Sequence, residues 1–448
     1  MESTLNNEPP QAVVAYTSYP WEHAISVMRI VGPLQRAGLK LIRGNVTDDI
    51  HPERVSLGDV VLIQREFPGY YQHYEQIVAS ARSEGKPIIY EIDDLLLDLP
   101  EEHPDRAIHY YTKSLFPMLE AILVADAVTA SNPDLCEYLR SLNPNTWLLP
   151  NYLEDALWPL EESPKNPVDP PVIVGYMGSN THLPDLELVS PVLLRLIERF
   201  GESISLKFWG GQPPETIRIN PRVEWIPLEM KNYAEFVSFF SHQHCDIFIA
   251  PLVDSQFNRC KSPIKYLEYS SRGIPGVYSR VTPFESVVHH GENGFLATTL
   301  AEWEDGLVRL IEDPELRLKL GMRALDTVKR EWLLSQHAHQ WPEVYTQALS
   351  SSNAERSRKL GYTEVMIKAL KQLYAWQREI DPDLHPALIE KEQEIAWLRA
   401  ELNNIYNSSS WAFIQKMQSI RRFFIPEGSK REQALISVLQ KLRQQRLV

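Results

Sequence analysis

Short β-branched runs alternate with amphipathic stretches in the first third of the chain, as they do in successive βαβ units. Apolar residues at helical spacing follow the first run and end at Gly38, and Pro33 predicts a kink in that helix. Asn132 followed by Pro133 is typical of a helix N-terminus. The pattern predicts a parallel sheet whose strands lie at 12–16, 60–63, 87–92, 127–129 and 147–149.

A segment with five prolines and little apolar periodicity interrupts this alternation between Trp158 and Val172. Such a composition is typical of an exposed linker. The alternation then restarts, with strands expected at 172–176 and near Leu206, Val223 and Ile247, and helical sequence follows from Leu307. We therefore expect an α/β fold with three parts: a first Rossmann-like domain at 1–160, a second at 161–349 and a helical extension at 350–448.

The extension carries two patterns of its own. Leu388, Ile395 and Leu402 share one heptad position, while Leu398 and Ile405 share its partner, over about two and a half heptads. This predicts either self-association through 388–405 or a single helix packed on the body. Residues 411–448 hold eight Lys or Arg against two Glu, with apolar residues on one helical face. They predict attachment to an anionic membrane surface, or else packing on the enzyme itself or on a second copy.

Composition narrows the class of protein. The formal net charge of -14 argues against a nucleic-acid partner. The N-terminus has no basic and then apolar segment, no run approaches the length of a membrane helix, and the cysteines are widely spaced. We expect a cytoplasmic protein, with the basic tail placing it peripherally on the inner face of the membrane. The histidines show no metal-binding spacing and no DxD ends a strand, so we expect no metal and no cofactor.

The segment from Asp246 to Pro275 is the most informative for chemistry. A buried strand is followed by a polar loop and a helix, with Ser262 as the expected N-cap and Pro263 at the first helical position. A helix N-terminus beside a strand's carboxyl end favours an anion. Lys261 and Lys265 would supply the positive charge that a diphosphate requires.

Glu268, within that helix, could accept hydrogen bonds from a ribose. The alternative is that Lys265 and Glu268 form an ordinary surface pair.

Several motifs in fixed order resemble the retaining GT-B glycosyltransferases of family four. They are KSPIKYLEY with the GIP that follows it, VIVGYMGSNTHLPDL, HHGENGFL, IIYEIDDLL and WLLPNYLE, and together they span roughly residues 12 to 348. The resemblance implies two Rossmann-like domains facing a cleft, with the acceptor on the first domain and a nucleotide-sugar donor on the second. It also implies catalysis with retention and without a metal.

Carried over residue by residue, the resemblance assigns catalytic roles to Asp93, Lys261 and Glu268. It assigns donor binding to Gly178, Ser179, Asn258, Lys261, Ser262, Lys265 and Glu268. Two positions depart from the family: Cys260 replaces the first glutamate of a pair, and Asp93 stands where many members have histidine. Asp93 can also be interpreted as a turn or helix-cap residue, and Gly178 as an ordinary strand-to-helix turn.

The function implied is transfer of a sugar from a nucleotide-diphosphate sugar to a glycan or lipid-linked acceptor, in the synthesis of a polysaccharide or other surface glycan. Two alternatives remain. One is a GT-B binding or scaffold protein in which Cys260 and Asp93 mark a decayed site. The other is a nucleotide-sugar epimerase, which would convert the donor without any acceptor.

Overall fold

The computed structural model describes residues 9–161, 171–228 and 232–350, with side chains as far as 347. The predicted extension at 350–448, including the heptad segment at 388–405 and the basic tail, lies outside the described residues. Most of the predicted proline-rich linker does so as well. Within the described ranges, no helix combines the length and the apolar character needed to cross a membrane.

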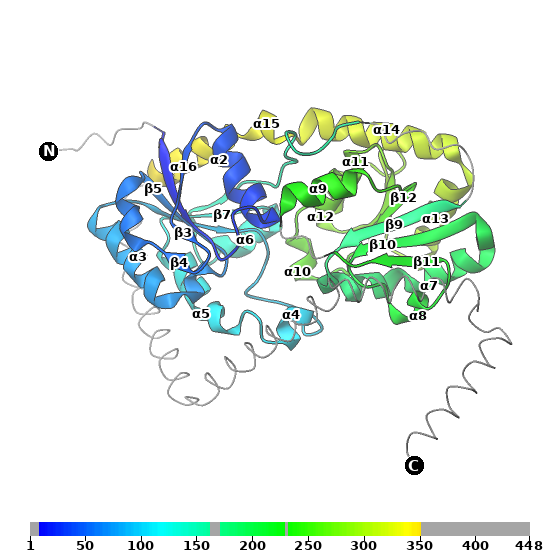
Figure 1. The fold of residues 1–448 in the computed structure, drawn as a ribbon, viewed down its shortest axis with the longest axis horizontal. Helices are drawn as coiled ribbons and strands as arrows, with labels where there is room; N and C mark the ends of the chain where they lie inside the picture. The colour runs from blue at the N-terminus through cyan, green and yellow to red at the C-terminus, as the bar shows by residue number, and fades with distance from the viewer. Residues whose placement is uncertain (1–8, 162–170, 229–231, 351–448) are drawn as a thin grey trace, which may run out of the picture. The chain divides into compact units, whose positions relative to one another are not determined.

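The first domain is built on a six-stranded parallel sheet in the order β2-β1-β5-β6-β7-β8. Figure 1 draws this domain in blue and cyan. Its strands are β1 (Ala12–Tyr16), β2 (Lys40–Arg43), β5 (Val60–Gln64), β6 (Ile88–Ile92), β7 (Ala127–Ala130) and β8 (Thr146–Leu148). The strands predicted from the pattern are confirmed to within about one residue. The edge strand β2 was missed because no residue of this short segment is fully buried, so it lacks a strong apolar pattern.

The helices of this domain follow the predicted pattern with one irregularity. They are α1 (Ala24–Ser26), α2 (Gly32–Arg36), α3 (Tyr71–Ser83), α4 (Pro104–Ala107), α5 (Leu115–Val124) and α6 (Pro133–Arg140). A π-helical turn at Val27–Val31 precedes Gly32 and Pro33, at the place where the sequence predicts a kink. Gly38 ends this segment with a φ of 72°. The side chain of Asn132 caps α6 by accepting from the backbone N–H of Asp134 and Leu135, at 2.7 and 3.2 Å.

The second domain repeats the architecture with a six-stranded parallel sheet in the order β11-β10-β9-β12-β13-β14. Its strands are β9 (Val172–Gly178), β10 (Ile204–Gly210), β11 (Val223–Ile226), β12 (Ile247–Ala250), β13 (Gly276–Ser279) and β14 (Phe295–Ala297). The helices are α7 (Leu183–Phe200), α8 (Glu215–Arg218), α9 (Tyr233–Ser241), α10 (Gln256–Arg259), α11 (Ile264–Ser270), α12 (Thr282–Glu285), α13 (Leu300–Glu312) and α14 (Pro314–Glu331).

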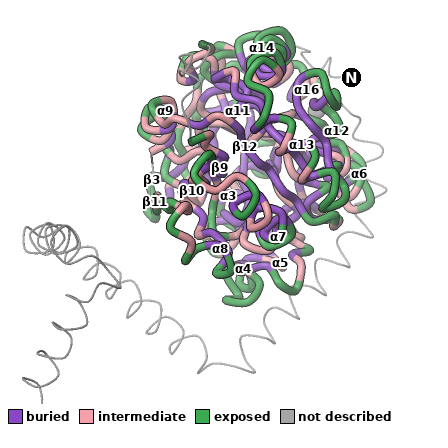
Figure 2. The backbone as a smooth tube through the Cα atoms, turned by 90° about the vertical axis from the view of Figure 1, so that its right-hand side faces the viewer, coloured by how far each residue is buried: buried purple, intermediate pink, exposed green. Residues whose placement is uncertain are grey.

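Apolar side chains fill both faces of each sheet, as expected for parallel strands covered by helices. Figure 2 colours the backbone by burial, and β12 is drawn there as buried. In the first sheet, Val14 and Tyr16 pack into one cluster and Val13 and Ala15 into the other. The carboxyl ends of the strands carry polar loops instead. Binding groups in an open parallel sheet are expected at these ends.

The last described helices return to the first domain. The helices α15 (Leu334–His337) and α16 (Gln340–Ser350) place Leu334, Trp341 and Tyr345 in the same cluster as Val13. The sequence pattern predicts that this segment closes the second domain, whereas its apolar side chains are buried against the first sheet. The limits of the domains at 160 and 349 otherwise remain predictions.

Candidate active site

The turn that leads into α11 differs from the predicted helix cap. Pro263 occupies the N-cap position and makes no side-chain cap bond, and the helix begins at Ile264. The hydroxyl of Ser262 instead accepts a hydrogen bond from Nδ2 of Asn151, at 2.9 Å. The prediction of Ser262 as N-cap is therefore wrong, because its hydroxyl is engaged by an amide of the first domain.

Lys265 lies on the first turn of α11, against the end of β9. Its Nζ is 3.4 Å from Nε2 of His182, and its ammonium lies 5.8 Å from the ring centroid of Tyr176. Nδ1 of His182 lies 2.8 Å from Oδ2 of Asp185. Burial and, to a smaller extent, the charge of Lys265 lower the pKa of His182 to about 4. The imidazole is therefore neutral near pH 7, so it can donate to Asp185 and accept from Lys265.

Glu268 lies one turn further along α11 and is 6% exposed. Its Oε1 is 3.5 Å from the hydroxyl of Tyr233, at the limit of hydrogen bonding. Burial raises the pKa of Glu268 to about 7, against the opposing effect of Lys265. Burial likewise lowers the pKa of Lys265 to about 8, partly offset by Glu268. The alternative of an ordinary surface pair does not fit this burial.

The other residues predicted to bind the donor differ in their surroundings. Gly178 ends β9. A Cβ at this position would collide with the hydroxyl of Tyr176, so the close packing of that hydroxyl against the backbone requires glycine. Ser179 follows on the surface, its hydroxyl 2.6 Å from that of Thr181. Nδ2 of Asn258 donates to Oδ1 of Asp185 at 3.0 Å and to the carbonyl of Val253 at 2.9 Å. The amide of Asn258 thus holds the loop together, and its NH₂ is already used.

Asp93 follows β6 and pairs with a buried arginine. Oδ1 of Asp93 accepts from Nη1 of Arg65 at 2.7 Å, and Nη2 of Arg65 donates to the hydroxyl of Tyr111 at 3.1 Å. Glu66 lies 3.3 Å from Nε of the same arginine. Arg65 has a φ of 47°, in the left-handed region that few side chains adopt. Its strained backbone and enclosed guanidinium mark the end of β5 as a specialised position.

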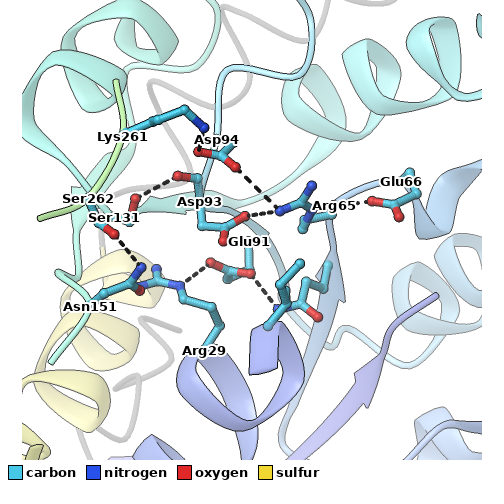
Figure 3. Close-up of polar contacts among 12 residues, drawn as sticks. Arg29, Arg65, Glu66, Glu91, Asp93, Asp94, Ser131, Asn151, Lys261 and Ser262 are labelled. Atoms are coloured by element: carbon cyan, nitrogen blue, oxygen red, sulfur yellow. Dashed lines mark hydrogen bonds and ion pairs between the residues drawn. The ribbon is translucent and has the colours of Figure 1, made fainter. Parts of the chain in front are cut away.

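Asp94 connects the two domains electrostatically (Figure 3). Its carboxylate lies 3.8 Å from Arg65 and 3.7 Å from Nζ of Lys261. Burial alone would raise the pKa of Asp94, but Lys261 and Arg65 outweigh it, and the pKa lies below its usual value. The ammonium of Lys261 also lies 4.4 Å from the ring centroid of Phe257. The predicted residues Asp93 and Lys261 are therefore in one site, although they come from different domains.

A second buried network lies beneath this site. Nε of Arg29 donates to Oε1 of Glu91 at 2.6 Å, and Nη1 donates to Oδ1 of Asn151 at 2.8 Å. Nε2 of Gln64 donates to the other oxygen of Glu91 at 2.8 Å. Arg29 and Glu91 are almost fully enclosed. The network fixes the loop after β8 that carries Asn151.

Cys260, at the position of the missing family glutamate, is buried with Phe257 among core residues of the first domain. Burial raises the pKa of its thiol to about 12, so it remains protonated. A cavity of about 600 Å³ opens beside it, between α6 and the segments around α10 and α12. The lining includes Cys260 but none of the predicted catalytic or donor-binding residues. The cavity therefore lies next to the candidate site without containing it.

Among the described residues, no group of three or more His, Cys, Asp and Glu is arranged to hold a metal ion. The charges available to a diphosphate in this part of the chain are those of Lys261, Lys265 and the N-terminus of α11. The prediction of a metal-independent reaction remains untested.

Sequence reasoning missed Arg65 and His182. Arg65 directly follows the buried strand at 60–64, so the rule that binding groups lie at strand ends could have found it. His182 was set aside because no metal-binding spacing surrounds it, yet it serves as a neutral hydrogen-bonding partner of Lys265. Spacing along the chain carries no signal for that contact, since the two residues are 83 positions apart.

Comparison with known proteins bears on the class of enzyme. Residues 173–313 match the family model described as Glycosyl transferases group 1. Comparison with curated protein sequences gives no match. The match confirms the predicted enzyme class, a glycosyltransferase, and it covers most of the second domain.

Solved structures resemble the chain over both domains. A sucrose-phosphate synthase from Thermosynechococcus elongatus is 15% identical with a TM-score of 0.53, covering 76% of this chain and 100% of its own. HepE from Anabaena, solved with UDP and glucose, is 13% identical with a TM-score of 0.54, covering 77% and 100%. A glycosyltransferase from Rickettsia africae is 11% identical with a TM-score of 0.51, covering 76% and 99%. The predicted GT-B architecture of two Rossmann-like domains is confirmed.

Proposed function

We propose that the protein transfers a sugar from a nucleotide-diphosphate sugar to a glycan or lipid-linked acceptor, with retention, in the synthesis of a polysaccharide or other surface glycan. The observation that carries the proposal is that basic side chains of the second domain lie next to acidic side chains of the first. Lys261 and Lys265 lie at the N-terminal end of α11, and the carboxylate of Asp94 from the first domain lies 3.7 Å from Nζ of Lys261. The neighbouring Asp93 is held by Arg65.

The second domain would bind the donor. The ammonium groups of Lys261 and Lys265 would face the diphosphate and stabilise the negative charge that develops as it leaves. Glu268 would accept hydrogen bonds from the ribose, which suits a buried carboxylate with few other partners. Gly178 would let the backbone approach the phosphates. HepE, which shares the fold, was solved with UDP bound, and this supports a nucleotide donor here.

The first domain would hold the acceptor. Asp93, fixed by Arg65 at 2.7 Å, would orient an acceptor hydroxyl beside the donor sugar. Because Cys260 replaces a glutamate and the NH₂ of Asn258 is engaged, the donor sugar would be contacted differently than in the family pattern.

Donor binding gives the direct test. Glu268→Ala should weaken the binding of UDP-glucose or another accepted donor by roughly 1–3 kcal/mol, because a charged hydrogen bond is lost. Lys261→Ala should lower turnover, because it removes positive charge facing the leaving group. The measurements are calorimetric donor binding and nucleotide release in steady state. Unchanged values for both variants would contradict the assignment.

The burial of Cys260 and the engaged amide of Asn258 favour a second candidate, a GT-B binding protein without turnover. Such a protein would bind a nucleotide sugar and release no nucleotide. Conversion of the donor without an acceptor would instead indicate an epimerase.

We propose in addition that the basic tail at 411–448 attaches the enzyme to the cytoplasmic face of a membrane, where a lipid-linked acceptor would lie. Its surplus of basic residues supports this. Full-length protein should float with anionic vesicles at low salt, and a version ending at Asn407 should not. Failure of both to float would contradict membrane attachment and leave the packing alternative.

A further inference from the structure

The turn at Lys261–Ser262 is held by two asparagines of the other domain, Asn132 and Asn151. Figure 3 shows the contact between Asn151 and Ser262. Nδ2 of Asn132 donates to the carbonyl oxygen of Lys261 at 2.8 Å, and Nδ2 of Asn151 donates to Oγ of Ser262 at 2.9 Å. Both asparagines are 3% exposed. Two buried side-chain amides thus form hydrogen bonds to consecutive residues in the turn before α11.

Each asparagine has its amide orientation fixed by its own oxygen. Oδ1 of Asn132 accepts from two backbone N–H groups at the start of α6, at 2.7 and 3.2 Å. Oδ1 of Asn151 accepts from Nη1 of Arg29, a side chain that also donates to the carbonyl of Leu149 and, through Nε, to Glu91. Because the oxygens face these donors, the NH₂ groups must face Lys261 and Ser262. The two contacts therefore have a defined donor and a defined direction.

The contact to Lys261 also sets the direction of a backbone N–H. In a planar trans peptide, the carbonyl of one residue and the N–H of the next point in opposite directions. With its carbonyl aimed at Asn132, the peptide between Lys261 and Ser262 turns the Ser262 N–H away from the first domain. Free N–H groups of this kind at a helix entrance are the groups that bind phosphate.

We infer that Asn132 and Asn151 are positioning residues for the diphosphate of the donor: they orient the Lys261–Ser262 peptide without touching the ligand. The inference rests on the proposed function. It assigns to the first domain a part in donor affinity, in addition to its proposed part in acceptor binding. The second domain then reaches its full affinity for phosphate only when Asn132 and Asn151 of the first domain contact the Lys261–Ser262 turn.

The test uses the full chain and the one of UDP, GDP and ADP that binds it most tightly by calorimetry. Asn132→Asp keeps the oxygen that caps α6 but replaces the NH₂ with an oxygen facing the carbonyl of Lys261. It should weaken nucleotide binding by roughly tenfold. The matched control is Asn232→Asp, since Asn232 caps α9 in the same way, at 2.9 and 3.3 Å. The control should stay within about twofold of wild type.

A double-mutant cycle tests the second contact. Ser262→Ala and Asn151→Ala should each weaken nucleotide binding, and the double variant should be no weaker than Asn151→Ala alone, because both remove one interaction. Circular dichroism at the binding temperature confirms that each variant is folded. Unchanged affinity in Asn132→Asp, or additive effects in the cycle, would overturn the inference while leaving the donor site intact. Failure of all three nucleotides to bind wild type would instead contradict the proposed function.

Discussion

The two sides of the candidate active site balance their charges in different ways. In the first domain, the buried guanidinium of Arg65 is surrounded by the carboxylates of Asp93, Glu66 and Asp94. In the second, Lys265 faces a neutral imidazole and Glu268, whose pKa is about 7. The first side surrounds one buried cation with three carboxylates, whereas on the second side Glu268 can exchange a proton near neutral pH. If the second domain binds a diphosphate as proposed, this side can respond to it by a change of protonation.

The largest expected effect is a difference between the two sides in the unfolding free energy that is lost when the buried cation is replaced. Arg65→Leu should cost roughly 3–5 kcal/mol of unfolding free energy, because it leaves buried carboxylates without their partner. Lys265→Met should cost much less at pH 6, because Glu268 can take up a proton and become neutral. Urea denaturation of both variants at pH 6 measures the difference. Similar losses would show that both sides depend on fixed charges.

A smaller effect should appear in the pH dependence of stability. The pKa of Glu268 is raised from its usual 4.5 to about 7, so the folded chain binds more protons than the unfolded chain between these values. This contribution to the unfolding free energy therefore falls as pH rises from about 4.5 to 7. Glu268→Gln removes it, so the variant should gain stability relative to wild type between pH 5 and pH 7.5. A constant difference in melting temperature across that range would contradict the raised pKa.

Removal of divalent metal ions is expected to leave the transfer activity unchanged. If the lysines and the α11 N-terminus provide the charge for the diphosphate, sugar transfer should continue in excess EDTA. Activity is measured with and without the chelator, and then after adding magnesium or manganese. Loss and recovery would mean that the second side requires a metal in addition to Lys261 and Lys265.

Much of the fold could be predicted because parallel strands buried on both faces are continuous apolar runs. β5 and β12 are buried along their whole lengths and were found on that basis. β2 carries no such signal, and α16 has an apolar face that does not reveal which sheet it covers.

The candidate site was predictable where its residues share one local segment. Lys261, Lys265 and Glu268 lie within eight positions, so a strand, loop and helix pattern brings them together. The partners of Asp93 were not predictable in this way. Its contact with Arg65 joins positions 28 apart, and the contact between Asn132 and Lys261 joins positions 129 apart. Such pairs depend on how the strands are ordered and how the domains meet.

The return of the chain to the first domain has a consequence for the connectivity of the molecule. Among the residues that the structure describes, two segments lead from one domain to the other, and they are joined where Leu153 bonds to Trp332 and Leu334 through backbone groups at 2.9 Å. A single proteolytic cut between 162 and 170 would therefore leave two fragments that remain associated, since the second crossing still carries α15 and α16 to their places on the first sheet. The same position offers new termini for a circular permutant. The chain of such a permutant would begin with the second domain and would reach the first domain through α15 and α16.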